Sequence, residues 1–238
     1  MTLTLKETTP GRVGLMAARP PAALLRRVPR QERGRVRVEK ILDAAADVIA
    51  STGVEAATTN AIAAQAQTSV GSLYQFFPNK EAIVDALAAR FNAELRRIND
   101  EAMSPESPDV SLQTLVDRVV TALLRFHQEN PAYRHVYQAT HRPDGAPGDK
   151  EAELHKAVTH RVEQLLEARA PQMPSYAKHL HATIAVLSVH ALLGFAMTAS
   201  PMMQTGIVDE LKAMIVTYLS DAINGRSALP PTAPAISA

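Results

Sequence analysis

The chain has 238 residues, no cysteine, 46% hydrophobic but only 4% aromatic residues, and a formal net charge of +1. The lack of cysteine excludes disulfide bonds, thiolate metal sites and cysteine catalysis, and it suits a reducing cytoplasm, where we expect the protein to act. No segment alternates cleanly at period two, and Ala and Leu predominate. The sequence therefore predicts an all-α fold.

Positive charge gathers at the N-terminus. Residues 1–38 hold nine Lys or Arg against two Glu, a net charge of +7, which leaves −6 for the rest of the chain. We predict that residues 1–34 form a disordered basic arm, because they are rich in Pro, Gly and Arg and lack a sustained period. Two interpretations stay open: a solvated tail, or an arm whose Arg side chains reach DNA phosphates or a minor groove.

Three helices are predicted next. A first helix over residues 35–51 has apolar residues at helical spacing and ends near Gly53. Two short helices follow, the first capped by Thr58 or Thr59 and the second by Ser69, because a hydroxyl accepts a bond from an orphan backbone N–H. A short polar helix held against a partner helix can enter the DNA major groove. The stripe of the first helix is expected to pack against Ile62, Ala66, Leu73 and Phe77.

This segment resembles the DNA-binding domain of the tetracycline-repressor (TetR) family over about residues 35–90. The positions that carry the resemblance, in the family's order and spacing, are Gly53, Thr58, Thr59, Ile62, Ala63, Ala66, Ser69, Gly71, Ser72, Leu73, Tyr74, Phe77, Lys80 and Glu81. One position departs: the family usually has Gly in the turn, where this chain has Gln67. If the turn needs a positive φ there, Gln costs about 1 kcal/mol.

The resemblance also implies site residues. Positions that match phosphate contacts are Thr59, Tyr74 and Lys80, and a hydroxyl or an ammonium group suits a phosphate. Positions that match base-edge contacts include Asn60, which can read adenine in the major groove. The alternative is a three-helix fragment that only packs. The full predicted DNA-binding set is Thr58, Thr59, Asn60, Ser69, Val70, Gly71, Ser72, Tyr74 and Lys80.

A helix of about six turns should follow the predicted cap Asn79, and we expect residues 81–100 to connect two domains. In the resembled family this helix links the DNA reader to a ligand domain, and its tilt changes on induction. A Pro-containing break at residues 104–111 separates it from the next helix. The predicted division is a helix-turn-helix domain over 35–80, a helical ligand-binding and dimerisation domain over 81–224, and a disordered tail over 225–238.

Within the second domain we predict helices over residues 112–126, 132–139, 149–170, 175–199 and 207–223, with a loop at 141–148 and a turn at 201–206. The helix at 175–199 is apolar on nearly all sides. A membrane span is the alternative, but polar residues interrupt the run and no second span exists. We expect one face to lie in the core and another, with the helix at 207–223, to form a homodimer.

A ligand pocket is implied by the resemblance, between the helices of the second domain, and ligand sites are mainly apolar with few polar anchors. The alternative is that the same side chains simply fill the core. The candidate ligand-binding residues are Phe126, Tyr133, Tyr137, His190, Phe195 and Met197.

Other chemistries find little support in the sequence. His179 and His181 are two residues apart, and His155 and His160 five apart, so neither pair shares a helical face for a metal. No phosphate-binding loop or nucleophile motif indicates an enzyme, and we expect neither a metal nor a cofactor. We therefore predict a repressor released from a palindromic DNA operator by a small apolar inducer. The alternatives are a ligand-independent regulator, an activator, a metal sensor, and a helical interaction module that does not bind DNA.

Overall fold

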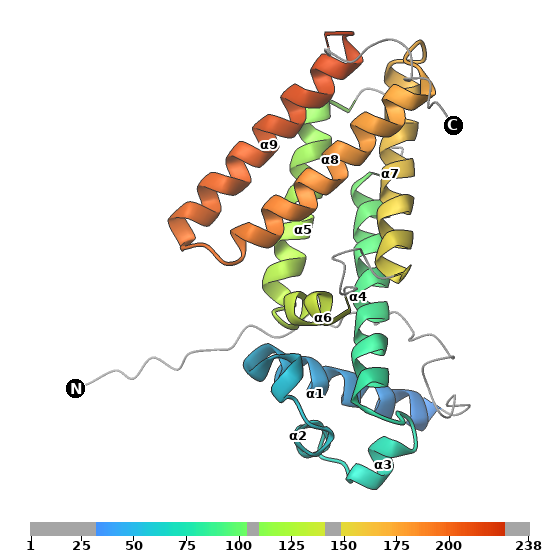
Figure 1. The fold of residues 1–238 in the computed structure, drawn as a ribbon, viewed down its shortest axis with the longest axis vertical. Coiled ribbons are helices and arrows are strands. Elements are labelled where there is room, and N and C mark those ends of the chain that lie inside the picture. Colours follow the sequence, from blue (N-terminus) through green and yellow to red (C-terminus); the bar gives the residue numbers. More distant parts are fainter. Residues whose placement is uncertain (1–31, 104–109, 141–148, 227–238) are drawn as a thin grey trace, which may run out of the picture.

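The structure, a computed structural model, describes residues 32–103, 110–140 and 149–226. Those residues form nine helices and no strand, which confirms the predicted all-α class (Figure 1). The predictions for residues 1–31, 104–109, 141–148 and 227–238 lie outside the described residues. The helices are α1 (Glu32–Ala56), α2 (Thr59–Gln65), α3 (Val70–Tyr74), α4 (Lys80–Ala102), α5 (Leu112–Glu129), α6 (Ala132–Thr140), α7 (Asp149–Arg169), α8 (Ser175–Ala196) and α9 (Pro201–Ile223).

Helices α1, α2 and α3 form the N-terminal unit. Gly53 interrupts the helical conformation of α1 with φ 77° and ψ 169°, near the predicted end of the helix. At its other end α1 begins at Glu32, so the last residues of the predicted arm are helical. The predicted packing is present, because the stripe of α1 shares one core with residues of α2, α3 and the turn after α3: Val38, Ile41, Leu42, Ala45, Ile49, Ile62, Ala66, Leu73 and Phe77.

Helix α4 runs from this unit into the C-terminal bundle (Figure 1). Its cap is Asn79, whose side chain accepts a bond from the Ala82 N–H at 2.8 Å, as predicted. At 1.5 Å per residue its 23 residues span about 34 Å. Helix α6 packs against both α1 and α4, between the N-terminal unit and the bundle. The core around α1 therefore continues across the predicted domain boundary to Phe126, Tyr133, Val136 and Leu154.

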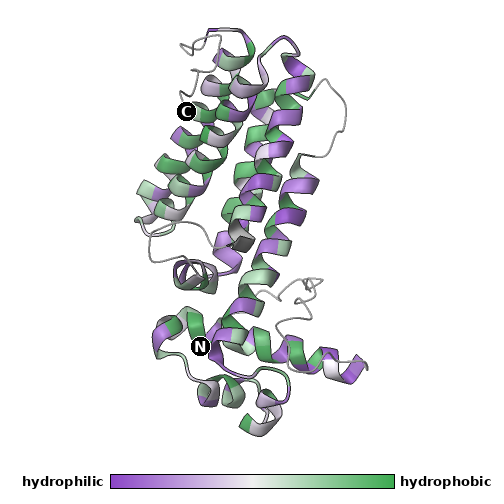
Figure 2. Ribbon diagram, turned by 45° about the vertical axis from the view of Figure 1, so that its right-hand side comes forward, coloured by the Kyte–Doolittle hydropathy of each residue, from purple (hydrophilic) through white to green (hydrophobic). Residues whose placement is uncertain are grey.

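Helices α5, α7, α8 and α9 enclose a second core. Helix α8 is, among the residues described here, the one helix long and apolar enough to cross a membrane by length and composition. Several of its residues pack into the second core, namely Ala182, Ala185, Leu193 and Ala196. Ile184 and Leu187 on the same helix are exposed. Figure 2 shows apolar residues spread around α8 and α9 rather than confined to one stripe.

The start of α9 corrects one prediction. Residues 201–206, predicted as a turn, are the first turns of α9, and α8 ends at Ala196 rather than at residue 199. Pro201 stands at the first helical position, where proline's fixed φ suits a helix and its missing N–H is not needed. The connection between the two helices is therefore shorter than predicted.

Candidate DNA interface and ligand cavity

Two side-chain caps fix α2 and α3. The Ala61 N–H donates to Thr58 Oγ1 at 3.1 Å, and the Ser72 N–H donates to Ser69 Oγ at 3.1 Å. Thr58 and Ser69 thus have a structural role in addition to any contact with DNA. In the turn between the helices Gln67 adopts φ +51°, the left-handed conformation that a glycine would occupy without strain.

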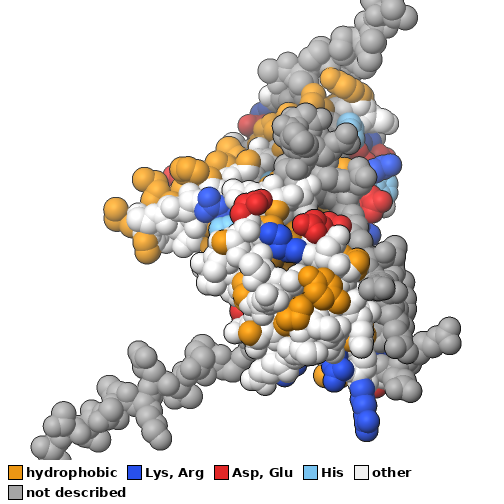
Figure 3. All heavy atoms as spheres, turned by 60° about the horizontal axis from the view of Figure 1, so that its bottom comes forward, with side chains coloured by type: hydrophobic (Ala, Val, Ile, Leu, Met, Phe, Trp, Pro, Cys, Tyr) orange, Lys and Arg blue, Asp and Glu red, His pale blue; other side chains and the backbone are white. Residues whose placement is uncertain are grey.

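Helices α2 and α3, which we call the reader, lie at one end of the molecule (Figure 1), and the predicted DNA-binding residues lie on them or at their N-caps, except Lys80, which is the first residue of α4. Tyr74 is 38% exposed, and its hydroxyl lies 3.2 Å from Thr59 Oγ1, so two predicted phosphate contacts form one hydroxyl pair. Asn60 is exposed, and a Cβ built on Gly71 would meet nothing within 4 Å, so the backbone there is open to approach. Figure 3 views this end: neutral groups make up most of it, and the Lys and Arg side chains are scattered.

Lys80 makes a contact that the sequence does not predict. Its ammonium group donates to the carbonyl oxygens of Val54 and Glu55 at 3.0 and 3.1 Å, at the end of α1. These bonds tie the first residue of α4 to the end of α1 and occupy two of the three N–H groups of the lysine. Lys80 is half-buried.

Two cations of α1 lie beside the reader. Arg37 Nη1 is 3.4 Å from Ser72 Oγ on α3, and Lys40 Nζ is 3.4 Å from Gln67 Oε1 in the turn. Both are exposed. Neither belongs to the predicted DNA-binding set, although Arg33, Arg37 and Lys40 stand at i, i+4 and i+7, the spacing of one helical face. Helices α2 and α3 themselves contain no charged residue.

A partly buried ionic group joins α1 to α4. Arg90 is 8% exposed, and its Nη1 lies 2.7 Å from Asp43 Oδ1 and 3.6 Å from Glu39 Oε2. The pKa of the Glu39 carboxyl is raised because the group is buried, and the positive charge of Arg90 opposes only part of this increase. The guanidinium also lies 5.9 Å from the centre of the Phe91 ring.

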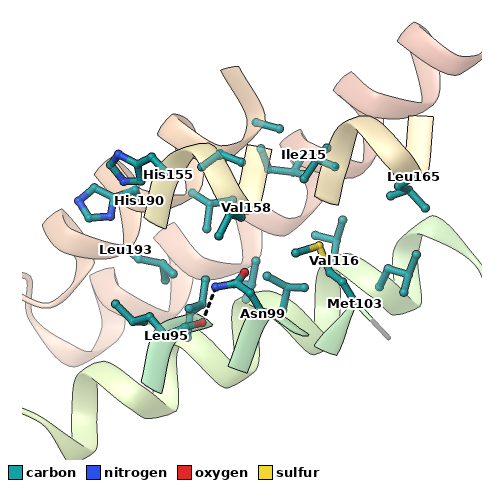
Figure 4. Close-up of a pocket in the computed structure, with 18 of the residues that line it drawn as sticks. Leu95, Asn99, Met103, Val116, His155, Val158, Leu165, His190, Leu193 and Ile215 are labelled. Carbon is teal, nitrogen blue, oxygen red and sulfur yellow. Dashed lines mark hydrogen bonds between the residues drawn. The ribbon is translucent and has the colours of Figure 1, made fainter. Parts of the chain in front are cut away.

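The C-terminal bundle contains a cavity of about 120 Å³. Its walls come mainly from aliphatic residues of α4, α5, α7, α8 and α9 (Figure 4). In that view His155 and His190 lie together at one end, Leu165 lies at the other, and Asn99 lies between them. The lining contains no Asp, Glu, Lys or Arg.

Of the six predicted ligand-binding residues, Tyr133 and His190 line this cavity. Tyr137 does not line it, although its ring lies 4.8 Å from that of His190. Phe126 is 2% exposed and packs in the first core, with its ring 5.1 Å from Tyr133. The remaining two lie at the far end of α8 and do not reach the cavity, since Phe195 is 60% exposed and Met197 contacts Gln204.

Three histidines, His127, His155 and His190, line the cavity. Burial lowers the pKa of His127 to about 4, so this ring is neutral near pH 7. The rings of His155 and His190 pack edge to face, with their centroids 5.0 Å apart. Over the described parts of the chain, no group of three or more His, Asp or Glu side chains is arranged to hold a metal ion.

Two family models match the chain. The model for bacterial regulatory proteins of the tetR family matches residues 41–87, and the model for the tetracyclin repressor-like C-terminal domain matches residues 111–219. The first covers the capped helices α2 and α3, and the second covers most of the helices around the cavity.

Curated relatives and solved structures agree with the family models. The chain is 30% identical over 102 residues to the uncharacterized HTH-type transcriptional regulator YhgD of Bacillus subtilis, and 32% identical over 95 residues to the HTH-type transcriptional repressor KstR of Mycobacterium tuberculosis. These matches cover 43% and 40% of this chain and 52% and 43% of the relatives, so the chain spans about half the length of the curated relatives it matches.

Among solved structures, a TetR-family transcriptional regulator from Streptomyces coelicolor matches with a TM-score of 0.59 and 24% identity, over 78% of this chain and 99% of that one. A putative transcriptional regulator from Pseudomonas aeruginosa matches with a TM-score of 0.62 and 16% identity, over 82% and 94%. Both share the fold. With a family match in each half and the capped helix-turn-helix between α1 and α4, the chain belongs to the TetR family of DNA-binding transcriptional regulators and is not an enzyme.

Proposed function

We propose that this protein is a cytoplasmic repressor that binds a palindromic operator as a homodimer and leaves it when a small, mainly apolar ligand enters the cavity. One observation carries the proposal: two helices that line the cavity also contact α1, the helix on which the DNA-binding helices α2 and α3 pack. Leu95 and Asn99 of α4 line the cavity, and Arg90 of the same helix is paired with α1. Tyr133 of α6 also lines the cavity, and α6 packs on α1.

For the DNA interface we infer two groups of contacts. The Thr59–Tyr74 hydroxyl pair and the third N–H of Lys80 meet phosphates, with the exposed Thr58 and Ser69 at the helix starts beside them. Asn60 on α2 and Val70, Gly71 and Ser72 on α3 approach base edges, with Asn60 suited to adenine and Val70 to a thymine methyl group.

The stripe formed by Arg33, Arg37 and Lys40 extends this interface onto α1. The uncharged α2 and α3 supply hydroxyl and backbone groups but no cation, whereas DNA affinity depends largely on cations that displace counterions from phosphates. Arg37 and Lys40 already contact the reader and are exposed to solvent. We therefore assign the stripe to phosphates that flank the major groove.

The dimer is proposed to form through α8 and α9. Among the described residues, seven of the nine exposed large apolar side chains lie on these two helices: Tyr176, Ile184, Leu187, Phe195, Met202, Met203 and Met214. Covering such a surface with a second copy removes it from water. A two-fold dimer would present two readers about 34 Å apart, one turn of DNA.

Release follows from a shift between two conformers. A ligand changes DNA affinity only if it binds one conformer more tightly than the other. Filling the cavity against Leu95 and Asn99 favours the conformer in which α4 is displaced. Because Arg90 and Lys80 couple α4 to α1, that displacement moves the reader and mismatches the operator spacing.

The test is selection of duplexes from a random pool by the purified protein, after unfolding and refolding to remove any bound ligand. We expect a palindromic consensus for the natural chain and none for Tyr74→Ala. A non-palindromic consensus would contradict DNA binding by a two-fold dimer, and no enrichment of any duplex would contradict sequence-specific binding. A reporter promoter that carries the selected site then separates the repressor from an activator by the direction of the change in transcription.

A further inference from the structure

Asn99 is a polar residue in the wall of an otherwise largely aliphatic cavity. It lies on α4 and is 6% exposed. Its Nδ2 donates to the carbonyl oxygen of Leu95, one helical turn earlier, at 2.8 Å. Figure 4 shows this bond and places the amide midway between the histidine end of the cavity and Leu165.

The bond to Leu95 fixes which amide atom faces the cavity. A backbone carbonyl can only accept, so the nitrogen of the Asn99 amide must point toward it. The oxygen, Oδ1, then points away from the helix. The hydrogen bond of Asn99 in the described residues is the one from Nδ2 to Leu95, and Oδ1 is not among the fully buried side-chain atoms that lack a partner, so this oxygen is accessible from the cavity. An acceptor that faces a largely aliphatic cavity can accept a hydrogen bond from a donor on a ligand.

The rest of the lining restricts the charge of any ligand. No charged side chain lies in the wall, and burying an ion without an opposite charge is strongly unfavourable. His127 in the same wall stays neutral near pH 7. Size is restricted too, since an apolar cavity of about 150 Å³ accepts benzene and this one measures about 120 Å³.

We propose that the cavity takes a neutral, mainly hydrocarbon molecule of about the size of one six-membered ring that carries a hydroxyl group, and that this hydroxyl donates to Asn99 Oδ1. The inference rests on the proposed ligand site but goes beyond it, because it names the chemical class. Asn99 is the residue that selects for a donor, and the aliphatic wall binds the hydrocarbon.

The experiment measures binding of four probes, phenol, toluene, anisole and benzoate, to the full chain by calorimetry. Phenol should bind about tenfold more tightly than toluene, the gain of one hydrogen bond. Benzoate should bind more weakly than either. Anisole, which keeps the oxygen but cannot donate, should bind like toluene, and this comparison needs no variant.

Two variants complete the test. Asn99→Leu should lower phenol affinity to the level of toluene, whereas Val116→Ala, another change in the wall, should alter both affinities alike. Equal binding of phenol and anisole, or tightest binding of benzoate, would overturn the inference and leave the ligand site standing. If no probe binds, the site and the inference both fall. If phenol binds preferentially but DNA affinity is unchanged, only ligand-triggered release fails.

Discussion

Arg90 on α4 and Asp43 on α1 are joined by an ion pair of 2.7 Å that links the helix lining the cavity to the helix supporting the DNA reader. The arginine is almost fully buried, whereas the Asp43 side chain is 55% exposed. Glu39 lies 3.6 Å from the same nitrogen and is half-buried. The Arg90 guanidinium thus lies close to two carboxylates at the junction between the N-terminal unit and the bundle.

Replacing this cation should destabilise the protein. We expect Arg90→Met to lower the free energy of unfolding by about 1–3 kcal/mol. This loss is small for a broken buried ion pair because Asp43 is partly solvated. Urea denaturation measures the change. Arg125→Met is the matched control, since Arg125 forms an exposed pair with Glu129 within one helix, and it should leave the unfolding midpoint unchanged. Equal effects of both variants would contradict a structural role for the junction.

Acid should weaken the fold through His127. Its pKa is lowered by burial to about 4, below the ordinary value of 6.5, so the unfolded chain takes up a proton first as the pH falls. Stability due to this group is therefore present above pH 6.5 and is lost between about 6.5 and 4. From pH 7 to pH 5 the loss is about 2 kcal/mol. His127→Gln should remove that part of the pH dependence in urea denaturation; an unchanged pH profile would contradict it.

Lys80 should affect both stability and DNA binding. Loss of its two bonds to the end of α1 is expected to lower the free energy of unfolding in Lys80→Ala by about 1–2 kcal/mol. Loss of a phosphate contact should also reduce the slope of log affinity against log salt by about one unit. Fluorescence anisotropy on the selected duplex gives that slope. A destabilised variant with the parental slope would show that Lys80 acts only within the protein.

The cationic stripe of α1, formed by Arg33, Arg37 and Lys40, offers a charge-matched comparison. Arg37→Ala should weaken binding to all duplexes and reduce the salt slope by about one unit. Arg35→Ala removes the same charge from the same helix, but Arg35 points to another side and lies 3.6 Å from Glu32. We expect its slope to stay near that of the parent. Equal losses for both variants would indicate a general charge effect rather than a contact.

Leu187→Glu should prevent dimer formation. Leu187 is 49% exposed on α8, and a carboxylate buried between two copies would lack a partner. Light scattering after size exclusion should give a dimer for the parent and a monomer for the variant. Val36→Glu changes an apolar side chain that is 60% exposed on α1 and should remain dimeric. A dimeric Leu187→Glu protein would place the interface elsewhere.

Local chemistry made much of the N-terminal unit predictable. Ser69 and Asn79 cap the helices they were predicted to cap, and Gln67 has the positive φ that a position usually occupied by glycine suggests. Such features depend on neighbouring residues in the chain, so the sequence contains them directly. The predicted roles of these residues in DNA binding remain predictions.

The cavity was less predictable because it depends on packing between distant helices. Helix α8 is apolar on most sides, so its sequence does not show which residues face inward. Phe195 was therefore placed in the pocket although it is exposed, and the inward-facing Asn99 was missed on a helix interpreted only as a connector. The bonds of Lys80 to the end of α1 were not predicted either, since a long side chain can reach carbonyls that the sequence does not place beside it.

The shared core around α1 limits how this regulator can be recombined with others. A hybrid joined at residue 80 would set Phe77 and the apolar residues of α1 against a foreign α4 and α6, although in this chain one core includes them with Leu87 and Val136. An exchange of operator preference between relatives is better made by transplanting only surface residues of α2 and α3. The exposed residues of α2 and α3 can be exchanged one by one, whereas α1, α4 and α6 have to be exchanged together because they share one core.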